Sequence, residues 1–238
     1  MLVEGINVVR ELLKSDKRIE KIIYEETENK DIVCLLDIAR AKGVDIELVD
    51  DKTFAKITKG KQGIVARIAP FKYTEIKDIL DYAKNKNQKP FIVILDGISD
   101  PHNLGAIIRT CECAGVHGVI IPENRACEVN ETVYKTSAGA VVNMKVAMVT
   151  NLVRTINDLK NQGLWIYALE AGEKSIYDVD FTYPTALIIG SEGKGVSRLV
   201  KQSADEIVSL DMFGSVNSLN ASNACAIGVY EVVRQRRK

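Results

Sequence analysis

The sequence predicts an α/β protein in which a small α/β domain precedes a larger domain built on a mainly parallel sheet. Three observations support this prediction. From residue 91 on, short and mostly unbroken apolar runs alternate with helical segments, as parallel strands buried on both faces do. Before residue 70, the strand-like runs are short and one of them alternates in polarity. Between the two parts, residues 70–89 read as a connection around one charged helix.

Composition limits the class of protein. The chain has 238 residues, of which 46% are hydrophobic and 27% charged, as in an ordinary soluble globular protein. No apolar run approaches the ~20 residues needed to cross a bilayer, and the N-terminus lacks the apolar core of a secretory signal. Five cysteines, an odd number without framework spacing, favour free thiols in a reducing cytoplasm.

The first domain is expected over residues 1–69, the linker over 70–89 and the second domain over 90–238. Helices are expected around residues 8–13 and 32–43, the latter ended by Gly43, and strands over 21–26, 44–50 and 63–69. Lysine plus arginine equal aspartate plus glutamate at 32 each, so a surface for nucleic acid has to be local. The best candidate is the acid-free segment 52–67, whose basic residues are Lys52, Lys56, Lys59, Lys61 and Arg67. The basic tail 234–238 is a second candidate.

The second domain is expected to place its ligand site at one edge of the sheet. Strands are predicted over 91–97, 117–122, 164–170, 185–190 and 206–211, with helices over 104–115, 151–163 and 196–204. Ligands of such sheets bind beyond the carboxyl ends of the strands. Polar or glycine-rich clusters follow three of these strands, which indicates a composite site.

The first cluster follows residues 91–97 and opens a helix. Asn103 is a good helix N-cap, and Arg109 lies six residues later, in the second turn of a largely apolar helix. A structural salt bridge is the alternative explanation for this arginine. The histidines of the chain lack metal-ligand spacing, so no metal site is predicted.

The second cluster is LIIGSEGKG, residues 187–195. Its glycine spacing matches neither the P-loop nor the dinucleotide-binding fingerprint. Glu192 would repel a phosphate, so the loop suits an uncharged or cationic ligand better than a pyrophosphate. The alternative is a tight strand–helix connection that needs positive φ angles.

The third cluster precedes the terminal helix and is crowded with small polar side chains. They exceed what one helix cap needs, so some of them are expected to bind a ligand. They are Ser215, Asn217, Ser218, Asn220, Ser222 and Asn223.

The three clusters together resemble the ordered motifs of the SpoU (TrmH-like) branch of the SPOUT methyltransferases. The matching segments are NLGAIIR (103–109), LIIGSEGKG (187–195) and SLNAS (218–222). The N-terminal segment resembles the L30e-like RNA-binding domain of the longer members. The overall resemblance is to 23S rRNA ribose 2′-O-methyltransferases of the RlmB type (TrmH group 3).

This resemblance implies an α/β knot, a homodimer with the active site near its interface, and S-adenosylmethionine as cofactor. It assigns Gly190, Leu210 and Leu219 to cofactor contact, with Ile189, Gly195, Met212 and Asn220 as neighbours. It makes Arg109 the central catalytic residue, supported by Asn103, Glu192, Ser218 and Asn220. Because a guanidinium does not act as a base in proteins, we expect Arg109 to bind the adjacent phosphate and stabilise the developing alkoxide.

The function that the resemblance implies is methylation of a ribose 2′-hydroxyl in RNA, on a guanosine of 23S rRNA rather than on tRNA. The chain departs from the family pattern at Asp211, where a proline is usual, and at Asn223, where a small apolar residue is more common. Three alternatives stay open: a tRNA 2′-O-methyltransferase, a non-catalytic RNA-binding or ribosome-assembly factor of the same fold, and a nucleotide-dependent Rossmann-type enzyme.

Overall fold

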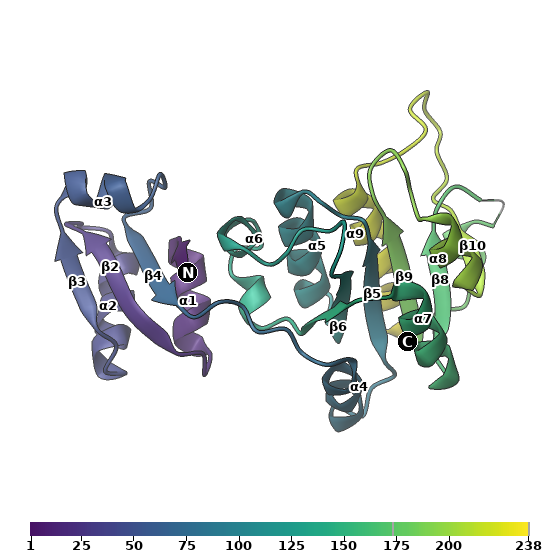
Figure 1. Ribbon diagram of the computed structural model, residues 1–238, viewed down its shortest axis with the longest axis horizontal. Helices are drawn as coiled ribbons and strands as arrows, with labels where there is room; N and C mark the ends of the chain where they lie inside the picture. The colour runs from purple at the N-terminus through teal and green to yellow at the C-terminus, as the bar shows by residue number, and fades with distance from the viewer. Residues whose placement is uncertain (173, 238) are drawn as a thin grey trace. The chain divides into compact units, whose positions relative to one another are not determined.

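The computed structural model describes residues 1–172 and 174–237. They form two units (Figure 1): the first holds Met1–Lys72 with Val129–Asn143, and the second holds Tyr73–Glu128 with the chain from Met144 on. This division differs from the expected one. Most of the expected linker belongs to the second unit, because Ile79 packs into its core.

The first unit is built on a four-stranded sheet in the order β1-β4-β2-β3. Its strands are β1 (Leu2–Glu4), β2 (Ile19–Glu25), β3 (Ile46–Val49) and β4 (Ile64–Ile68), and its helices are α1 (Ile6–Lys14), α2 (Lys30–Ala41) and α3 (Asp51–Ile57). Strand β4 runs antiparallel to β1 and β2, whereas β3 is parallel to β2. Phe54 of α3 packs on Ile23 and Val65. The predicted stop after α2 is confirmed, since Gly43 has a φ of 69°.

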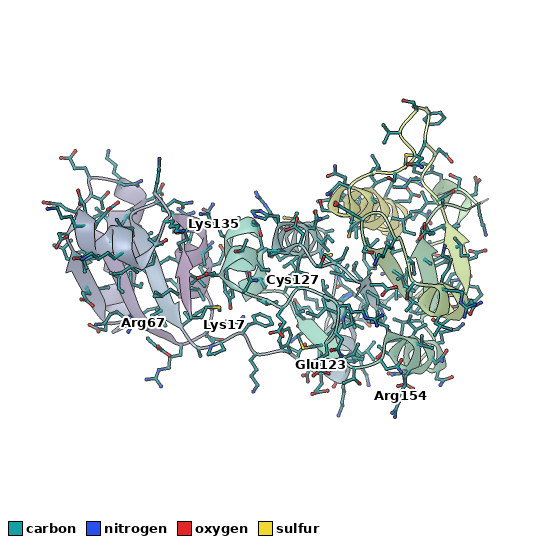
Figure 2. The ribbon with its side chains drawn as sticks, turned by 45° about the horizontal axis from the view of Figure 1, so that its top comes forward. Lys17, Arg67, Glu123, Cys127, Lys135 and Arg154 are labelled. Carbon is teal, nitrogen blue, oxygen red and sulfur yellow. The ribbon has the colours of Figure 1, made fainter. Side chains whose placement is uncertain are left out.

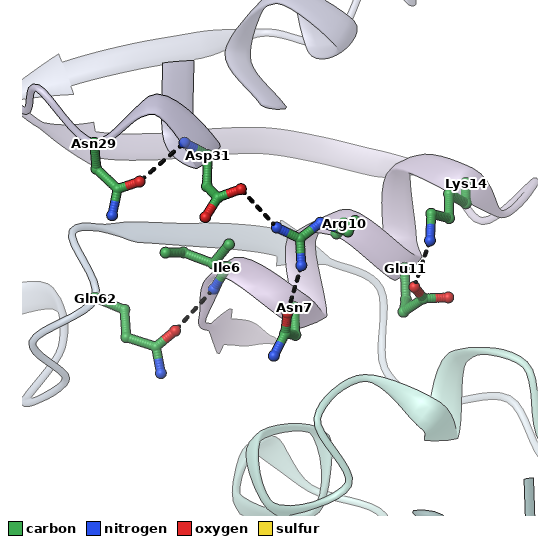
Figure 3. Close-up of polar contacts among 8 residues, drawn as sticks. All are labelled: Ile6, Asn7, Arg10, Glu11, Lys14, Asn29, Asp31 and Gln62. Atoms are coloured by element: carbon green, nitrogen blue, oxygen red, sulfur yellow. Dashed lines mark hydrogen bonds and ion pairs between the residues drawn. The ribbon is translucent and has the colours of Figure 1, made fainter. Parts of the chain in front are cut away.

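Local polar contacts fix the ends of the helices in this unit (Figure 3). The Gln62 side chain accepts a hydrogen bond of 2.9 Å from the backbone N–H of Ile6, at the start of α1. Arg10 of α1 pairs with Asp31 of α2 at 3.2 Å, which ties the two helices together. Asn29 caps α2 by accepting a bond from the Asp31 N–H.

A segment distant in sequence completes the first unit. It contains α6 (Glu131–Thr136) and a 3₁₀ helix, η1 (Ala140–Val142). Lys135, labelled in Figure 2, pairs with Glu4 of β1. The Asn143 amide donates to Glu11 of α1 at 3.0 Å. Sequence patterning assigned this segment to the second domain because a discontinuous unit leaves no periodicity that marks it.

The second unit is built on a six-stranded sheet in the order β10-β8-β9-β5-β6-β7, in which every neighbouring pair is parallel. Five of its strands were expected. They are β5 (Phe91–Asp96), β6 (Gly118–Pro122), β8 (Trp165–Leu169), β9 (Thr185–Gly190) and β10 (Glu206–Val208), and β7 (Val146–Val149) is the unexpected sixth. The mainly parallel α/β architecture predicted from the apolar runs is therefore confirmed.

Helices cover both faces of this sheet (Figure 1). On one face, α4 (Ile76–Asn85), α7 (Leu152–Asn161) and α8 (Arg198–Ser203) share one core with the strands. On the other face lie α5 (Pro101–Cys113) and α9 (Ala221–Arg236), which pack against each other, while α9 also packs on β9. A short 3₁₀ helix, η2 (Ile176–Asp178), contacts α9. Burial on both faces explains why Phe91–Leu95 is an unbroken buried run.

Candidate functional site

A cavity of about 810 Å³ opens at the carboxyl ends of β8 and β9. Its walls are the turn after β9 and the long loop before α9. All the residues expected to contact or neighbour the cofactor line it: Ile189, Gly190, Gly195, Leu210, Met212, Leu219 and Asn220. Glu192 and Ser218 line it as well. The second and third clusters of the sequence therefore form one site.

The turn after β9 requires its glycines. Ser191 and Gly195 exchange two backbone hydrogen bonds, of 2.9 and 3.2 Å, which close the loop tightly. A Cβ atom on Gly190 would overlap the backbone of Gly195 and Val196, and Gly195 has a φ of 64°. No other residue fits these two positions without strain. The glycines therefore fix the shape of the turn that lines the cavity.

One hydrogen-bond network joins all three clusters. The Asn103 amide on α5 donates to Glu192 Oε1 at 3.1 Å, and the Asn220 amide donates to Asn103 Oδ1 at 3.0 Å. Asn220 also donates to the same Glu192 oxygen. Asn103 is 9% exposed, so its amide is held in a largely buried position. Glu192 therefore accepts two amide donors, one from each of the other clusters.

Asn220 has a second task at the start of α9. Its Oδ1 accepts hydrogen bonds from the Ser222 N–H at 2.9 Å and the Ser222 hydroxyl at 2.5 Å, so it is the N-cap of that helix. The oxygen of the Asn220 amide therefore caps α9, and its nitrogen joins the start of that helix to the network.

Arg109 lies apart from this network. It is exposed on α5 and does not line the cavity, and it forms no ion pair with any residue that the structure describes. Asn103 and Arg109 are six residues apart, which places them on different sides of the helix. Glu192 was expected to orient Arg109 or a partner group, and its hydrogen-bond partners in the described chain are the two amides.

Sequence patterning missed one wall of the cavity. Leu169, Glu170, Ala171 and Gly172 line it from the end of β8. Glu170 Oε2 accepts a hydrogen bond of 2.7 Å from the Val196 N–H, and its carboxylate occupies the space that a Cβ on Gly195 would need. The signal was available, because the run LWIYALE was read as a strand of the same sheet and its carboxyl end had to lie at the same edge.

The charge of the cavity is negative. Among the described residues, Glu170, Glu192 and Asp211 line it together with one basic side chain, Lys194. Lys201, outside the lining, pairs with Glu170 at 3.7 Å and offsets part of this charge. Asp211 stands where the family usually has a proline, and its Oδ2 accepts a hydrogen bond of 3.1 Å from the Ser175 hydroxyl. A cavity of this charge attracts a cationic ligand and disfavours a polyphosphate.

The basic residues expected to bind RNA all lie in the first unit. Lys52 and Lys56 are on α3, Lys59 and Lys61 follow it, and Arg67 is on β4 (Figure 2). All five are exposed, and none forms an ion pair within the described residues. In the basic tail, Lys238 lies outside the described residues.

The described residues contain neither a metal-binding cluster nor a membrane-spanning helix. No three or more His, Cys, Asp and Glu side chains are grouped as they would be around a metal ion. None of the helices has both the length and the apolar character needed to span a membrane.

Comparison with known proteins assigns the class. Residues 90–230 match the model of the SpoU rRNA methylase family, and residues 2–74 match the model described as RNA 2′-O ribose methyltransferase substrate binding. The chain belongs to the SpoU rRNA methylase family, and its fold is that of the SPOUT methyltransferases.

Individual relatives agree with this assignment. YacO of Bacillus subtilis, named as a member of the TrmH family of tRNA/rRNA methyltransferases, is 42% identical over 98% of this chain and 94% of its own length. The crystal structure of the SpoU methyltransferase AviRb from Streptomyces viridochromogenes, in complex with AdoMet, has a TM-score of 0.85 at 24% identity and covers 100% of this chain and 90% of its own. The TrmH/SpoU tRNA modifying enzyme of A. aeolicus has a TM-score of 0.58 at 31% identity and covers 67% and 84%. The protein is an RNA methyltransferase of the SpoU/TrmH group.

Proposed function

We propose that this protein transfers a methyl group from S-adenosylmethionine to the 2′-hydroxyl of a ribose in RNA, on a guanosine of 23S rRNA. The observation that carries the proposal is the network of Asn103, Glu192 and Asn220, which brings the three family motifs to one glycine-lined cavity. The match of residues 2–74 to a substrate-binding model favours rRNA over tRNA, since the tRNA modifying enzyme of A. aeolicus covers only 67% of this chain.

The cavity fits the cofactor in size and charge. A volume of about 810 Å³ is in the range of cofactor sites. Gly190 and Gly195 allow the turn to close tightly and the Glu170 carboxylate to lie against it, and both glycines line the cavity. The acidic lining suits a sulfonium cation. S-adenosylmethionine supplies an activated methyl group when bound, and the residues that line the cavity would hold it.

The residues of the chain have to position the ribose and stabilise the negative charge that develops on its 2′-oxygen when the hydroxyl loses its proton. Arg109 presents an exposed guanidinium on α5 with no carboxylate partner in the described chain, so it is free to bind an RNA phosphate and to stabilise an alkoxide. Glu192 accepts from Asn103 and Asn220 and thereby holds both amides in fixed positions. Ser218, exposed on the loop before α9, lines the cavity and would order that loop around the cofactor.

RNA binding is proposed for the first unit, through the exposed cations of residues 52–67. Changing Lys59 and Lys61 together to alanine should weaken RNA binding several-fold and flatten its salt dependence, because each lysine that contacts a phosphate releases counterions. Filter binding at several salt concentrations measures this, with cofactor affinity as the internal control. RNA affinity equal to that of the parent would remove this segment from the interface.

A homodimer is proposed on the strength of the resemblance and of apolar exposure on the terminal helix. Ile227 and Tyr230 of α9 are 39% and 48% exposed, on a helix whose other side packs on the sheet. Analytical ultracentrifugation checks the proposal, and a monomer at micromolar concentration would contradict it.

The experiment for the activity is transfer of a labelled methyl group to unmodified rRNA and tRNA, followed by mapping of the modified nucleotide. A 2′-O-methylribose blocks alkaline cleavage of the adjacent phosphodiester, so the position is read directly. Label in a base would contradict the ribose assignment, and label in tRNA alone would contradict the rRNA target. Cofactor binding without transfer to either RNA would support the non-catalytic RNA-binding factor.

A further inference from the structure

A second cavity lies at the opposite edge of the six-stranded sheet. Its volume is about 540 Å³, and it borders the amino ends of β5, β6 and β9. Among the described residues no carboxylate lines it. The charged side chains that line it are all basic: Lys86, Lys89, Arg236 and Arg237. Phe91, Ala114 and Val233 give it an apolar wall.

Helix ends account for part of this basic character. The C-caps of α4, α5 and α9 are Lys86, Ala114 and Arg237, and all three line the cavity. A helix C-terminus carries about half a negative charge and attracts cations. Asp180 adds a carboxylate outside the lining, whose pKa is lowered by hydrogen bonds from Thr182 and, less, by the charge of Lys89. These negative contributions offset only part of four full positive charges.

The Arg236 guanidinium is engaged in hydrogen bonds with backbone carbonyls beside the cavity. It donates to the carbonyls of Phe181 and Lys89, both at 3.0 Å, and to that of Tyr183 at 2.5 Å. Burial lowers its pKa to about 10, so it stays charged at neutral pH. Lys86, Lys89 and Arg237 form no ion pair with a carboxylate among the described residues. The Lys89 ammonium donates one hydrogen bond of 2.8 Å to the Thr182 carbonyl, and the Lys86 ammonium lies 4.4 Å from the centre of the Tyr82 ring, so both keep N–H donors for a ligand.

His117 lines the cavity, and the charges of the neighbouring cations affect its pKa. Its Nδ1 accepts a hydrogen bond of 3.0 Å from the Phe91 N–H, and its Nε2 lies 3.0 Å from Gln88 Oε1. With Nδ1 as acceptor, the ring is neutral and Nε2–H donates to Gln88. Burial, followed by the charge of Lys86, lowers its pKa to about 4. An anion bound nearby would oppose the second of these causes.

We propose that this cavity binds a phosphate group, either of a free nucleotide or of an RNA backbone, with Lys86, Lys89 and Arg237 as its ligands. Lysine and arginine are the side chains that bind phosphate best. The apolar wall beside them fits the sugar or base to which the phosphate is attached, and the volume suits one nucleotide. The cavity shares no lining residue with the first one, so this site is separate from the methyl-transfer site.

Histidine NMR on the full-length protein tests the proposal without a variant. The chain has 2 histidines, and His102, exposed at the start of α5, serves as the internal control. S-adenosylhomocysteine in excess keeps adenosine groups out of the first cavity while AMP is titrated. We expect AMP to shift the His117 resonances and raise the His117 pKa by at least half a unit, with His102 less affected. No shift of His117 at 10 mM AMP would overturn the proposal.

Two further probes identify the chemistry and its source. Adenosine lacks the phosphate and should leave His117 unchanged; a shift equal to that of AMP would overturn the proposal. An RNA dinucleotide without terminal phosphates carries only the backbone phosphodiester. If it shifts His117 as AMP does, the source is RNA, and if only AMP acts, the source is a free nucleotide.

A charge-matched pair of variants localises the effect. Lys86→Gln with Arg237→Gln should raise the Kd for AMP on the order of tenfold, since two charge-assisted hydrogen bonds are lost. Lys84→Gln with Arg154→Gln removes the same net charge from exposed positions outside the cavity and should leave the Kd unchanged. Equal Kd values in the two variants would overturn the proposal. Unaltered thermal unfolding of both variants is the folding control, and the titration of the parent protein does not depend on either.

Discussion

The two edges of the parallel sheet differ in charge. At the carboxyl edge, three carboxylates and one lysine line a cavity of about 810 Å³. At the amino edge, four cations and no described carboxylate line a cavity of about 540 Å³. The chain as a whole carries equal numbers of basic and acidic residues, 32 of each. A neutral protein can therefore offer sites of opposite charge on one sheet.

The difference follows from the direction of the strands and helices. Parallel strands bring their carboxyl ends, with the turns that follow them, to one edge, and the helices that cover the sheet run back to the other. At the carboxyl edge α5 and α9 begin, so backbone N–H groups and the amide of Asn220 are presented there. At the amino edge α4, α5 and α9 end, and the ends of α4 and α9 carry basic residues. The carboxyl edge is the one at which we place the chemistry, and changes there test that placement.

The largest effect is expected from Arg109→Lys. The variant keeps the charge but loses the planar fork that binds a phosphate through two bonds, so methyl transfer should fall roughly a hundredfold with cofactor affinity unchanged. Single-turnover transfer to RNA and calorimetry with S-adenosylmethionine measure the two quantities. Arg154→Lys on α7, labelled in Figure 2, is the matched control. Turnover close to that of the parent would show that only the positive charge of Arg109 matters and that its planar geometry does not.

A smaller effect is expected from Gly190→Ala. The added methyl group would overlap the backbone of Gly195 and Val196, so the turn has to open and cofactor affinity should fall roughly thirtyfold. Gly214→Ala, in the loop before α9, meets nothing within 4 Å and is the control. Calorimetry with S-adenosylmethionine measures both affinities. Equal affinities in the two variants would show that cofactor binding does not depend on the tight turn.

Asn220→Asp separates the cap of α9 from the network. The aspartate keeps the oxygen that accepts from Ser222, but it loses the amide that donates to Glu192 and Asn103. Methyl transfer should fall about tenfold, because the new carboxylate faces that of Glu192 instead of donating to it, and the thermal midpoint should fall less than in a variant that also loses the cap. Asn220→Ala loses both functions and should lower both quantities. If the aspartate variant were fully active, the network would be dispensable.

The smallest effect is expected from Asp211→Asn, which reduces the negative charge of the carboxyl edge by one. S-adenosylmethionine carries one more positive charge than its product S-adenosylhomocysteine, so affinity for the former should fall about threefold with the latter unaffected. Asp178→Asn, exposed on η2 outside the cavity, is the control. Parallel changes in both affinities would argue for lost packing rather than charge.

Much of the fold and most of the lining of the cavity at the carboxyl edge were predictable from the sequence. Five of the strands of the parallel sheet were recognisable because burial on both faces leaves unbroken apolar runs such as Phe91–Leu95. The spacing of Gly190 and Gly195 with Glu192 excluded a phosphate loop, and the three ordered motifs carried the resemblance to the SpoU family. These signals are local, so a single sequence contains them.

Other features depended on contacts between distant segments. The pairing of Val129–Asn143 with the first unit has no periodic signal, because it rests on contacts such as Asn143 with Glu11. The position of Glu170 at the carboxyl end of a strand follows from the sequence, but its hydrogen bond from the Val196 N–H depends on the tertiary structure. The basic cavity gathers Lys86, Lys89 and Arg237 from segments about 150 residues apart in the chain, which only the meeting of three helix ends brings together. The sequence determined which local structures form and which residues are charged, and the tertiary structure decided which of those charges share a cavity.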